Sequence, residues 1–150
     1  MSPLLYLIVI MAVFAGVIGQ GAVRSRHCRN RLRALAHEWN MHFAPGDRLR
    51  LAQRVAGHFP VPGAANIRVR DLFFRTDESR HQYLFTVDYT VGVIRGKVGR
   101  SCVAGFQEPV SHHLHHSSSL SSPELVIEPL GGTAVDEAYK RVMSKLNGVR

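Results

Sequence analysis

The feature that most constrains this chain is an uncharged apolar run near its start, followed at once by a cluster of arginines. Residues 3–23 contain no charged side chain, and at about 1.5 Å per residue they form a helix of roughly 31 Å. That length matches the hydrocarbon core of a bilayer. The run therefore predicts a transmembrane anchor over residues 1–23. The arginines that follow it within ten residues are Arg24, Arg26, Arg29, Arg31 and Arg33.

Arginines beside a membrane span mark its cytoplasmic side. We therefore expect a single-pass protein of the inner (cytoplasmic) membrane, with its N-terminus outside and its C-terminal domain in the cytoplasm. A cleaved signal peptide ending near Val13-Phe14-Ala15 is the alternative, but its positive charges should precede the apolar run rather than follow it. Small residues at Ala12, Gly16 and Gly19 allow close helix approach and a homodimer, although such residues are common in membrane helices in any case.

The rest of the chain has enough apolar residues to fold. The composition is 45% apolar and 20% charged, which excludes a wholly disordered protein. Residues 24–44 predict a basic juxtamembrane amphipathic helix, because Leu32, Leu35, Trp39 and Phe43 recur at helical spacing. Residues 45–150 then form an α+β domain, in which Asp47 caps a short helix that ends near Gly57.

Alternating apolar residues predict strands in the middle of the domain. Residues 83–93 and 97–106 form a hairpin if Arg95-Gly96 is a two-residue turn, which pairs Phe85 with Phe106 and Val87 with Ala104. An upstream strand places Val69 opposite Val87 and Arg68 opposite Asp88. Asp71 would put a charge on the apolar face, so we expect a β-bulge near Asp71-Leu72.

The chain ends in a short strand at Leu125–Ile127 and a helix that begins after Thr133. The apolar stripe of this helix is Val135, Ala138, Val142 and Leu146. The predicted fold class is therefore α+β: an N-terminal transmembrane helix followed by a small domain with an antiparallel meander of three or four strands packed on helices.

Several segments resemble a group of small bacterial single-pass membrane-anchored proteins to which no function is assigned. The likeness covers about residues 24–109 and rests on LAHEWNMHFAPGD, PVPGAANIRVRDLFF, YLFTVDYTVGVIRGK and VAGFQEP. These motifs are structural rather than catalytic. The resemblance implies a bacterial origin and this architecture, and it implies no activity.

Residues 110–123 are rich in His and Ser, and we expect a mobile loop there. Its clustered imidazoles are weak candidates for a metal site, because a Ser-rich loop offers no fixed geometry. Cys102 lies in a predicted strand, where a cysteine is usually a small apolar residue. Since no catalytic motif is present, we expect neither an enzyme nor a cofactor. The histidines concerned are His112, His113, His115 and His116.

The formal net charge is +8, and the five clustered arginines account for most of it. Anionic headgroups of the inner leaflet explain their position, and the rest of the chain is too weakly basic to predict nucleic-acid binding. The sequence therefore favours a membrane-anchored, non-enzymatic interaction or scaffold module with an unknown protein partner. Two alternatives remain: a metal-responsive or enzymatic domain using the His-rich loop or Cys102, and a sensor of anionic lipid surfaces.

Overall fold

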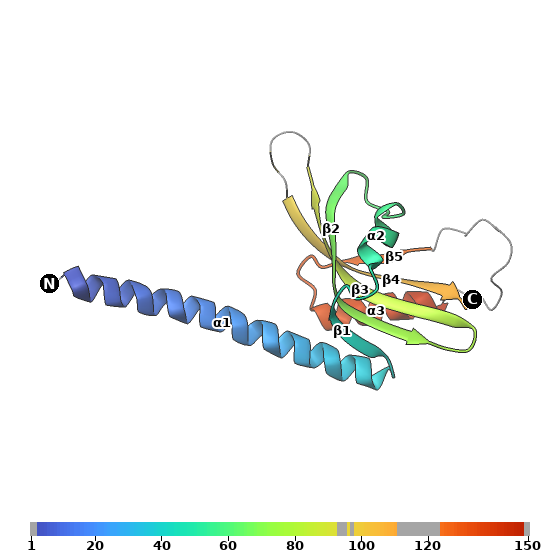
Figure 1. Cartoon of the computed structure of the whole chain (residues 1–150), viewed down its shortest axis with the longest axis horizontal. Coiled ribbons are helices and arrows are strands. Elements are labelled where there is room, and N and C mark those ends of the chain that lie inside the picture. The colour runs from blue at the N-terminus through green and yellow to red at the C-terminus, as the bar shows by residue number, and fades with distance from the viewer. Residues whose placement is uncertain (1–2, 93–95, 97, 111–123, 149–150) are drawn as a thin grey trace.

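The fold combines three helices with one antiparallel sheet, seen in a computed structural model that describes residues 3–92, 96, 98–110 and 124–148 (Figure 1). Side chains within the first helix are described for residues 4, 6–14 and 25–38. The elements in chain order are α1 (Pro3–Glu38), β1 (His42–Gly46), α2 (Leu51–Ala56), β2 (Ala64–Thr76), β3 (Arg80–Val91), β4 (Val98–Pro109), β5 (Val126–Pro129) and α3 (Val135–Gly148).

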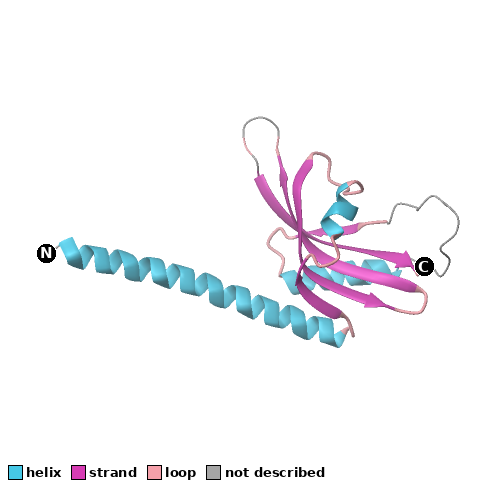
Figure 2. Cartoon of the chain, in the orientation of Figure 1, coloured by secondary structure: helices cyan, strands magenta, loops and turns pink. Residues whose placement is uncertain are grey.

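The five strands form a meander in the order β1-β2-β3-β4-β5 (Figure 2), and each face of the sheet carries its own apolar core. On one face, Phe73 and Leu84 pack with Leu32 of α1 and Tyr139 of α3. On the other face, Phe85 belongs to the cluster that buries Leu51 and Val55 of α2. The sheet is thus the middle layer, with α3 and the end of α1 on one side and α2 on the other.

The predicted transmembrane anchor over residues 1–23 is wrong. Within the part of the chain that the structure describes, no helix is long and apolar enough to cross a membrane. Residues 3–23 and the arginines that follow them belong to one helix, since α1 continues unbroken for 36 residues. The predictions of a single-pass protein, of the inner membrane, and of an outside N-terminus with a cytoplasmic domain depended on that anchor and are wrong with it.

The predicted fold class is wrong for the same reason, and its strand count is also too low. The described chain is an α+β fold with a five-stranded antiparallel sheet. The additional strand is β1, which contains Phe43, a residue that the helical spacing had placed in a helix over residues 24–44. That helix instead ends at Glu38.

The end of α1 has a local cause. Asn40 adopts a left-handed conformation with φ 54°, which Asn tolerates better than most residues. The amide of Asn40 donates to the carbonyl of His37, and the amide of Met41 donates to the carbonyl of Ala36 at 2.8 Å. These two bonds form a Schellman motif, which turns the chain back so that β1 joins the sheet beside β2.

Asp47 bonds to the first turn of α2, as predicted, although the residue at the N-cap position is Arg50, which is left-handed with φ 53°. Asp47 Oδ1 accepts a hydrogen bond from the Leu51 amide at 2.7 Å, and Oδ2 accepts one from the Ala52 amide at 2.9 Å. Each carboxylate oxygen thus satisfies an amide in the first turn, which has no partner within the helix. Leu51 and Val55 are buried against the sheet, as expected.

The β2–β3 register is confirmed at Val69–Val87 and Arg68–Asp88, and so is the irregularity near Asp71, which lies between Arg70 and Phe73. Asp88 forms its ion pair with Arg70 and not with Arg68, the residue opposite it, and the distance from Arg70 Nε to Asp88 Oδ2 is 2.7 Å.

The predicted β3–β4 register is wrong by two residues. Phe85 pairs with Ala104 and Val87 with Cys102, and the ladder closes at Val91–Val98. Six residues therefore connect the strands instead of two. The predicted turn at Arg95-Gly96 falls mostly outside the described residues. Because side chains alternate with period two, a shift of two residues keeps every side chain on its expected face.

Candidate functional site

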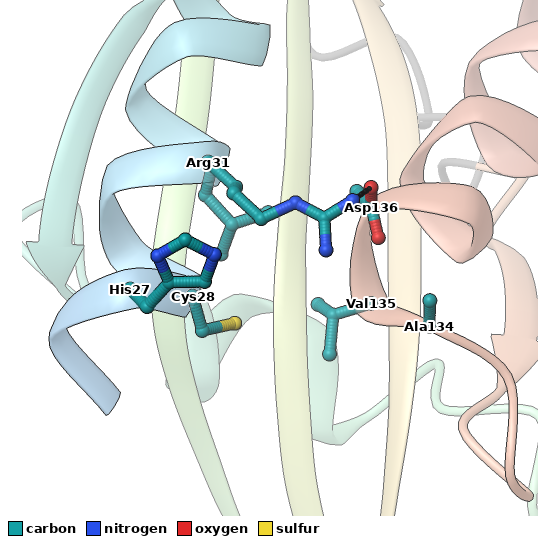
Figure 3. Close-up of a pocket in the computed structure, with 7 residues that line it drawn as sticks. His27, Cys28, Arg31, Ala134, Val135 and Asp136 are labelled. Atoms are coloured by element: carbon teal, nitrogen blue, oxygen red, sulfur yellow. Dashed lines mark hydrogen bonds and ion pairs between the residues drawn. The ribbon is translucent and has the colours of Figure 1, made fainter. Parts of the chain in front are cut away.

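A cavity of about 350 Å³ lies in the seam between α1 and α3. The α1 residues that line it recur at the spacing of one helix face; they are His27, Cys28, Arg31 and Leu32. The opposite side is formed by Val135 and Asp136 at the start of α3 and by Ala134 just before it. Figure 3 shows His27 and Cys28 on one side and Val135 on the other, with the Arg31 side chain reaching across to Asp136. The walls are mainly apolar, and the charged groups lie at the rim.

The ion pair across this cavity joins Arg31 Nη2 to Asp136 Oδ2 at 2.8 Å. The two side chains differ in burial, since Arg31 is 58% exposed and Asp136 is 21% exposed. Asp136 lies in the first turn of α3, where a carboxylate is favoured by the helix dipole. A solvent-exposed pair of this kind stabilises a fold only weakly, so the apolar contacts of α1 hold it to the domain.

A buried polar network lies one helical turn further along α3. Tyr139 is fully buried; its hydroxyl donates to the backbone carbonyl of Asp71 at 2.6 Å and lies 3.0 Å from Thr86 Oγ1. Its ring stacks on Phe73 with the centroids 4.5 Å apart. Burial raises the pKa of Tyr139 far above its ordinary value, so this hydroxyl keeps its proton. Cys28 packs against the same apolar cluster, which links the network to the cavity.

Asp71 is the most unusual charged residue of the domain. It sits at the irregularity of β2 with φ 51°, it is only 7% exposed, and its Oδ1 has no hydrogen-bond partner among the described residues. Burial raises the pKa of the Asp71 carboxyl, and the positive charges of Arg70 and Arg29 partly oppose that rise. A buried carboxylate oxygen without a hydrogen-bond partner is destabilising, so Asp71 lowers the stability of the fold.

We expect Asp71→Asn to make the protein more stable at neutral pH, by on the order of 1 kcal/mol. Asn keeps the shape and tolerates a left-handed backbone, but it carries no charge. A carboxyl whose pKa is raised in the folded state loses stability as the pH rises from its unfolded pKa, near 3.9, through its folded pKa. The difference in free energy of unfolding between variant and parent should therefore grow from pH 4 upward and then level off.

Urea unfolding of both proteins between pH 4 and pH 8 measures this difference. Because every other titrating group is shared, the subtraction isolates Asp71. A difference that does not change with pH would show that the Asp71 carboxyl is not desolvated in the folded protein.

The structure separates the other predicted site residues. Cys102 is buried in β4, and burial, with a smaller contribution from the charge of Asp88, raises the pKa of its thiol to about 12. This disfavours Cys102 as a nucleophile, since the thiolate is the reactive form. His112, His113, His115 and His116 lie outside the described residues. Within the described ranges, no group of three or more His, Cys, Asp or Glu side chains could hold a metal ion.

The predicted arginine surface is partly used within the fold. Arg31 pairs with Asp136, and the guanidinium carbon of Arg33 lies 5.8 Å from the centre of the Phe43 ring. Arg26 and Arg29 are exposed, and the side chain of Arg24 is outside the described part. Binding of these residues to an anionic lipid surface stays a prediction.

The first half of α1 presents a second candidate surface. It projects from the domain, with the N-terminus far from the sheet (Figure 1). Its described large apolar side chains are between 52% and 68% exposed; they are Leu4, Tyr6, Leu7, Ile8, Val9, Ile10, Met11, Val13 and Phe14. Because these are nearly consecutive, they surround the helix instead of lining one face. Such a surface is rarely left exposed to water.

A polar groove of about 500 Å³ crosses the sheet near the β3–β4 connection, lined in part by Arg68, Asp88, Thr90 and Ser101. Asp88, the carboxylate among its described lining residues, already accepts from Arg70 and from the Ser101 hydroxyl. The groove is wide and open, and its described lining residues include no arrangement of acid, base and nucleophile.

Sequence reasoning missed Tyr139 and the pairing of α1 with α3. Tyr139 follows Val135 by four residues and precedes Val142 by three, so helical spacing alone could have placed it in the apolar stripe. No sequence signal links Arg31 to Asp136, which lie 105 residues apart. Comparisons of the chain with protein-family models, with curated proteins and with solved structures found no match.

Proposed function

We propose that this protein is a non-enzymatic interaction module, and that the first half of α1 is the segment that binds a partner protein. The observation that supports the proposal is the set of exposed apolar side chains, Leu4 and those within 6–14, that surround a helix projecting beyond its own domain. A helix that is apolar on every side needs to be buried on every side. The partner is therefore expected to supply several apolar surfaces, as a bundle of helices does.

The domain supports this function as a rigid platform. The C-terminal part of α1 is fixed to the sheet through Leu32, Leu35 and Ala36, each at most 5% exposed. The first half belongs to the same unbroken helix. Binding at the projecting half would therefore be transmitted to the seam with α3 through one rigid element.

Site-specific photo-crosslinking of the full chain in its own cells tests this proposal. A photoreactive side chain at Ile8 or Phe14 should give a discrete protein adduct, and one at Ser144, on an exposed position of α3, should give none. The double substitution Ile8→Asn with Met11→Asn should abolish the adduct, because each buried amide without a hydrogen-bond partner costs about 1–3 kcal/mol.

A differently tagged second copy in the same cells identifies the partner. An adduct that contains both tags would mean a homodimer, for which Ala12, Gly16 and Gly19 are the predicted contact. An adduct with one tag would mean another protein. If neither Ile8 nor Phe14 gives a protein adduct, or if Ser144 gives the same ones, the proposal is wrong.

A further inference from the structure

We infer that the cavity between α1 and α3 binds a small free carboxylic acid, whose apolar body packs between Leu32 and Val135 and whose carboxylate pairs with Arg31. This goes beyond the interaction proposed above, since it concerns a small ligand at a different place in the fold. It is argued from three properties of the cavity: its size, its walls and the unused donors at its rim.

The size and walls favour a compact apolar body. A volume of about 350 Å³ lies within the range of small-molecule sites, roughly 300–1,000 Å³, and the cavity is partly open to solvent, so that a ligand can enter it. Leu32, Ala134 and Val135 offer carbon atoms on facing walls, and Cys28 adds a polarizable sulfur. A hydrocarbon chain or ring would restore the dispersion contacts that these atoms lack.

The rim favours an anionic head. A guanidinium has five N–H donors, and Arg31 contacts Asp136 through a single nitrogen, Nη2, so the interaction is not the bidentate one that saturates this group. The ring of His27 lies on the same rim (Figure 3). The N–H groups of Arg31 that do not contact Asp136 can therefore donate to a second carboxylate.

Asp136 and the ligand carboxylate would share one guanidinium. Substituting Arg31 and substituting Asp136 should therefore change the affinity for the ligand in opposite directions. Removing the donor, with Arg31→Gln, should weaken binding of a carboxylate. Removing the competitor, with Asp136→Asn, should strengthen it by up to about fivefold, the factor that corresponds to the upper end for an exposed ion pair. If the ion pair only holds α1 against α3, the two substitutions should have the same effect.

Alkylation of Cys28 by iodoacetamide reports occupancy of the cavity in the full chain. Cys28 is half-buried in the cavity wall, and buried Cys102 serves as an internal control for folding. The probe is 3-phenylpropanoate, and 3-phenylpropanamide is the matched control with the same body and no charge. Peptide mass spectrometry measures the rate at Cys28 with each compound and in each variant.

We expect 3-phenylpropanoate to slow alkylation of Cys28 saturably, by about tenfold at ten times its Kd, and the amide to protect much less. Arg31→Gln should remove the difference between acid and amide, and Asp136→Asn should enlarge it. Val135→Phe, which fills the cavity, should slow the alkylation of Cys28 in the absence of probe and abolish the further protection by 3-phenylpropanoate.

Three results would overturn the inference: no saturable protection by the acid, equal protection by acid and amide, or a parallel shift in both rim variants. The parallel shift in both rim variants counts against the inference only if Cys102 stays unreactive, because an unreactive Cys102 shows that the variants are folded. If Cys102 becomes reactive in either rim variant, the acid-against-amide comparison in the parent chain decides alone.

Discussion

Replacing Tyr139 should produce the larger of the two strongest losses of stability in this protein. Tyr139→Phe is expected to cost about 1–3 kcal/mol, because it leaves the carbonyl of Asp71 and the hydroxyl of Thr86 buried without their shared partner. Tyr139→Ala also removes the ring that stacks on Phe73, and loss of a buried aromatic ring costs about 3–5 kcal/mol. Since domains of this size are stable by about 5–15 kcal/mol, the alanine variant should lose a large part of its free energy of unfolding.

Urea unfolding of the two variants separates the contribution of the hydroxyl from that of the ring. Tyr6→Phe is the matched control, because Tyr6 is 65% exposed and its hydroxyl has water as a partner; its effect should stay within about 0.5 kcal/mol. Thr86→Val combined with Tyr139→Phe should cost less than the sum of the single changes, because the double variant no longer leaves one buried hydroxyl without the other. Equal stability of Tyr139→Phe and the parent would contradict the network.

Local signals in the sequence predicted the parts of the fold that local physics determines. The cap at Asp47 was predictable, because a carboxylate shortly before a helix commonly accepts hydrogen bonds from the amides of the first turn, as Asp47 does from Leu51. The irregularity at Asp71 was predictable for a similar reason, because alternation alone would have buried a charge on the apolar face. In both places, a polar side chain beside an apolar pattern is compatible with only a few local structures.

The sequence was misleading where several different structures are compatible with the same local pattern. Either a two-residue or a six-residue connection between β3 and β4 keeps Phe85 and Val87 on the same face, so alternation could not choose the register. The helical spacing through Phe43 continued a helix that Asn40 ends. The run over residues 3–23 was interpreted as a membrane span because its length and lack of charge match a bilayer core, whereas no helix in the described part of the chain is long and apolar enough to cross a membrane.

The candidate cavity could not be predicted, because it is a property of tertiary packing. His27 and Cys28 lie within an arginine-rich stretch and Asp136 lies in the first turn of a helix, and nothing in these local settings indicates that the three residues meet. They lie together because Leu32 and Val142 pack on the same face of the sheet. What the sequence did contain was the stripe Val135, Ala138, Val142 and Leu146, which fixes the face of α3 that turns inward.

The contact between that stripe and the sheet makes Gly105→Ala the second strongly destabilising change. A Cβ at Gly105 in β4 would lie 2.8 Å from Leu146 Cδ1, 2.9 Å from Val142 Cγ1 and 3.1 Å from the carbonyl oxygen of Tyr83. Leu146 can yield by changing rotamer, but Val142 is β-branched and stiff and the carbonyl belongs to the neighbouring strand. Such overpacking typically costs about 1–3 kcal/mol, so we expect a loss of that size in urea unfolding.

Gly99→Ala in the same strand is the control, because a Cβ there meets nothing within 4 Å, and it should be neutral or slightly stabilising. Val142→Ala, which makes room, should cost less in the Gly105→Ala background than alone.

Because α3 also supplies Val135 and Asp136, pushing it away from the sheet should open the seam and speed alkylation of Cys28. Equal stability of Gly105→Ala and Gly99→Ala would mean that α3 does not rest on β4 as closely as this structure places it.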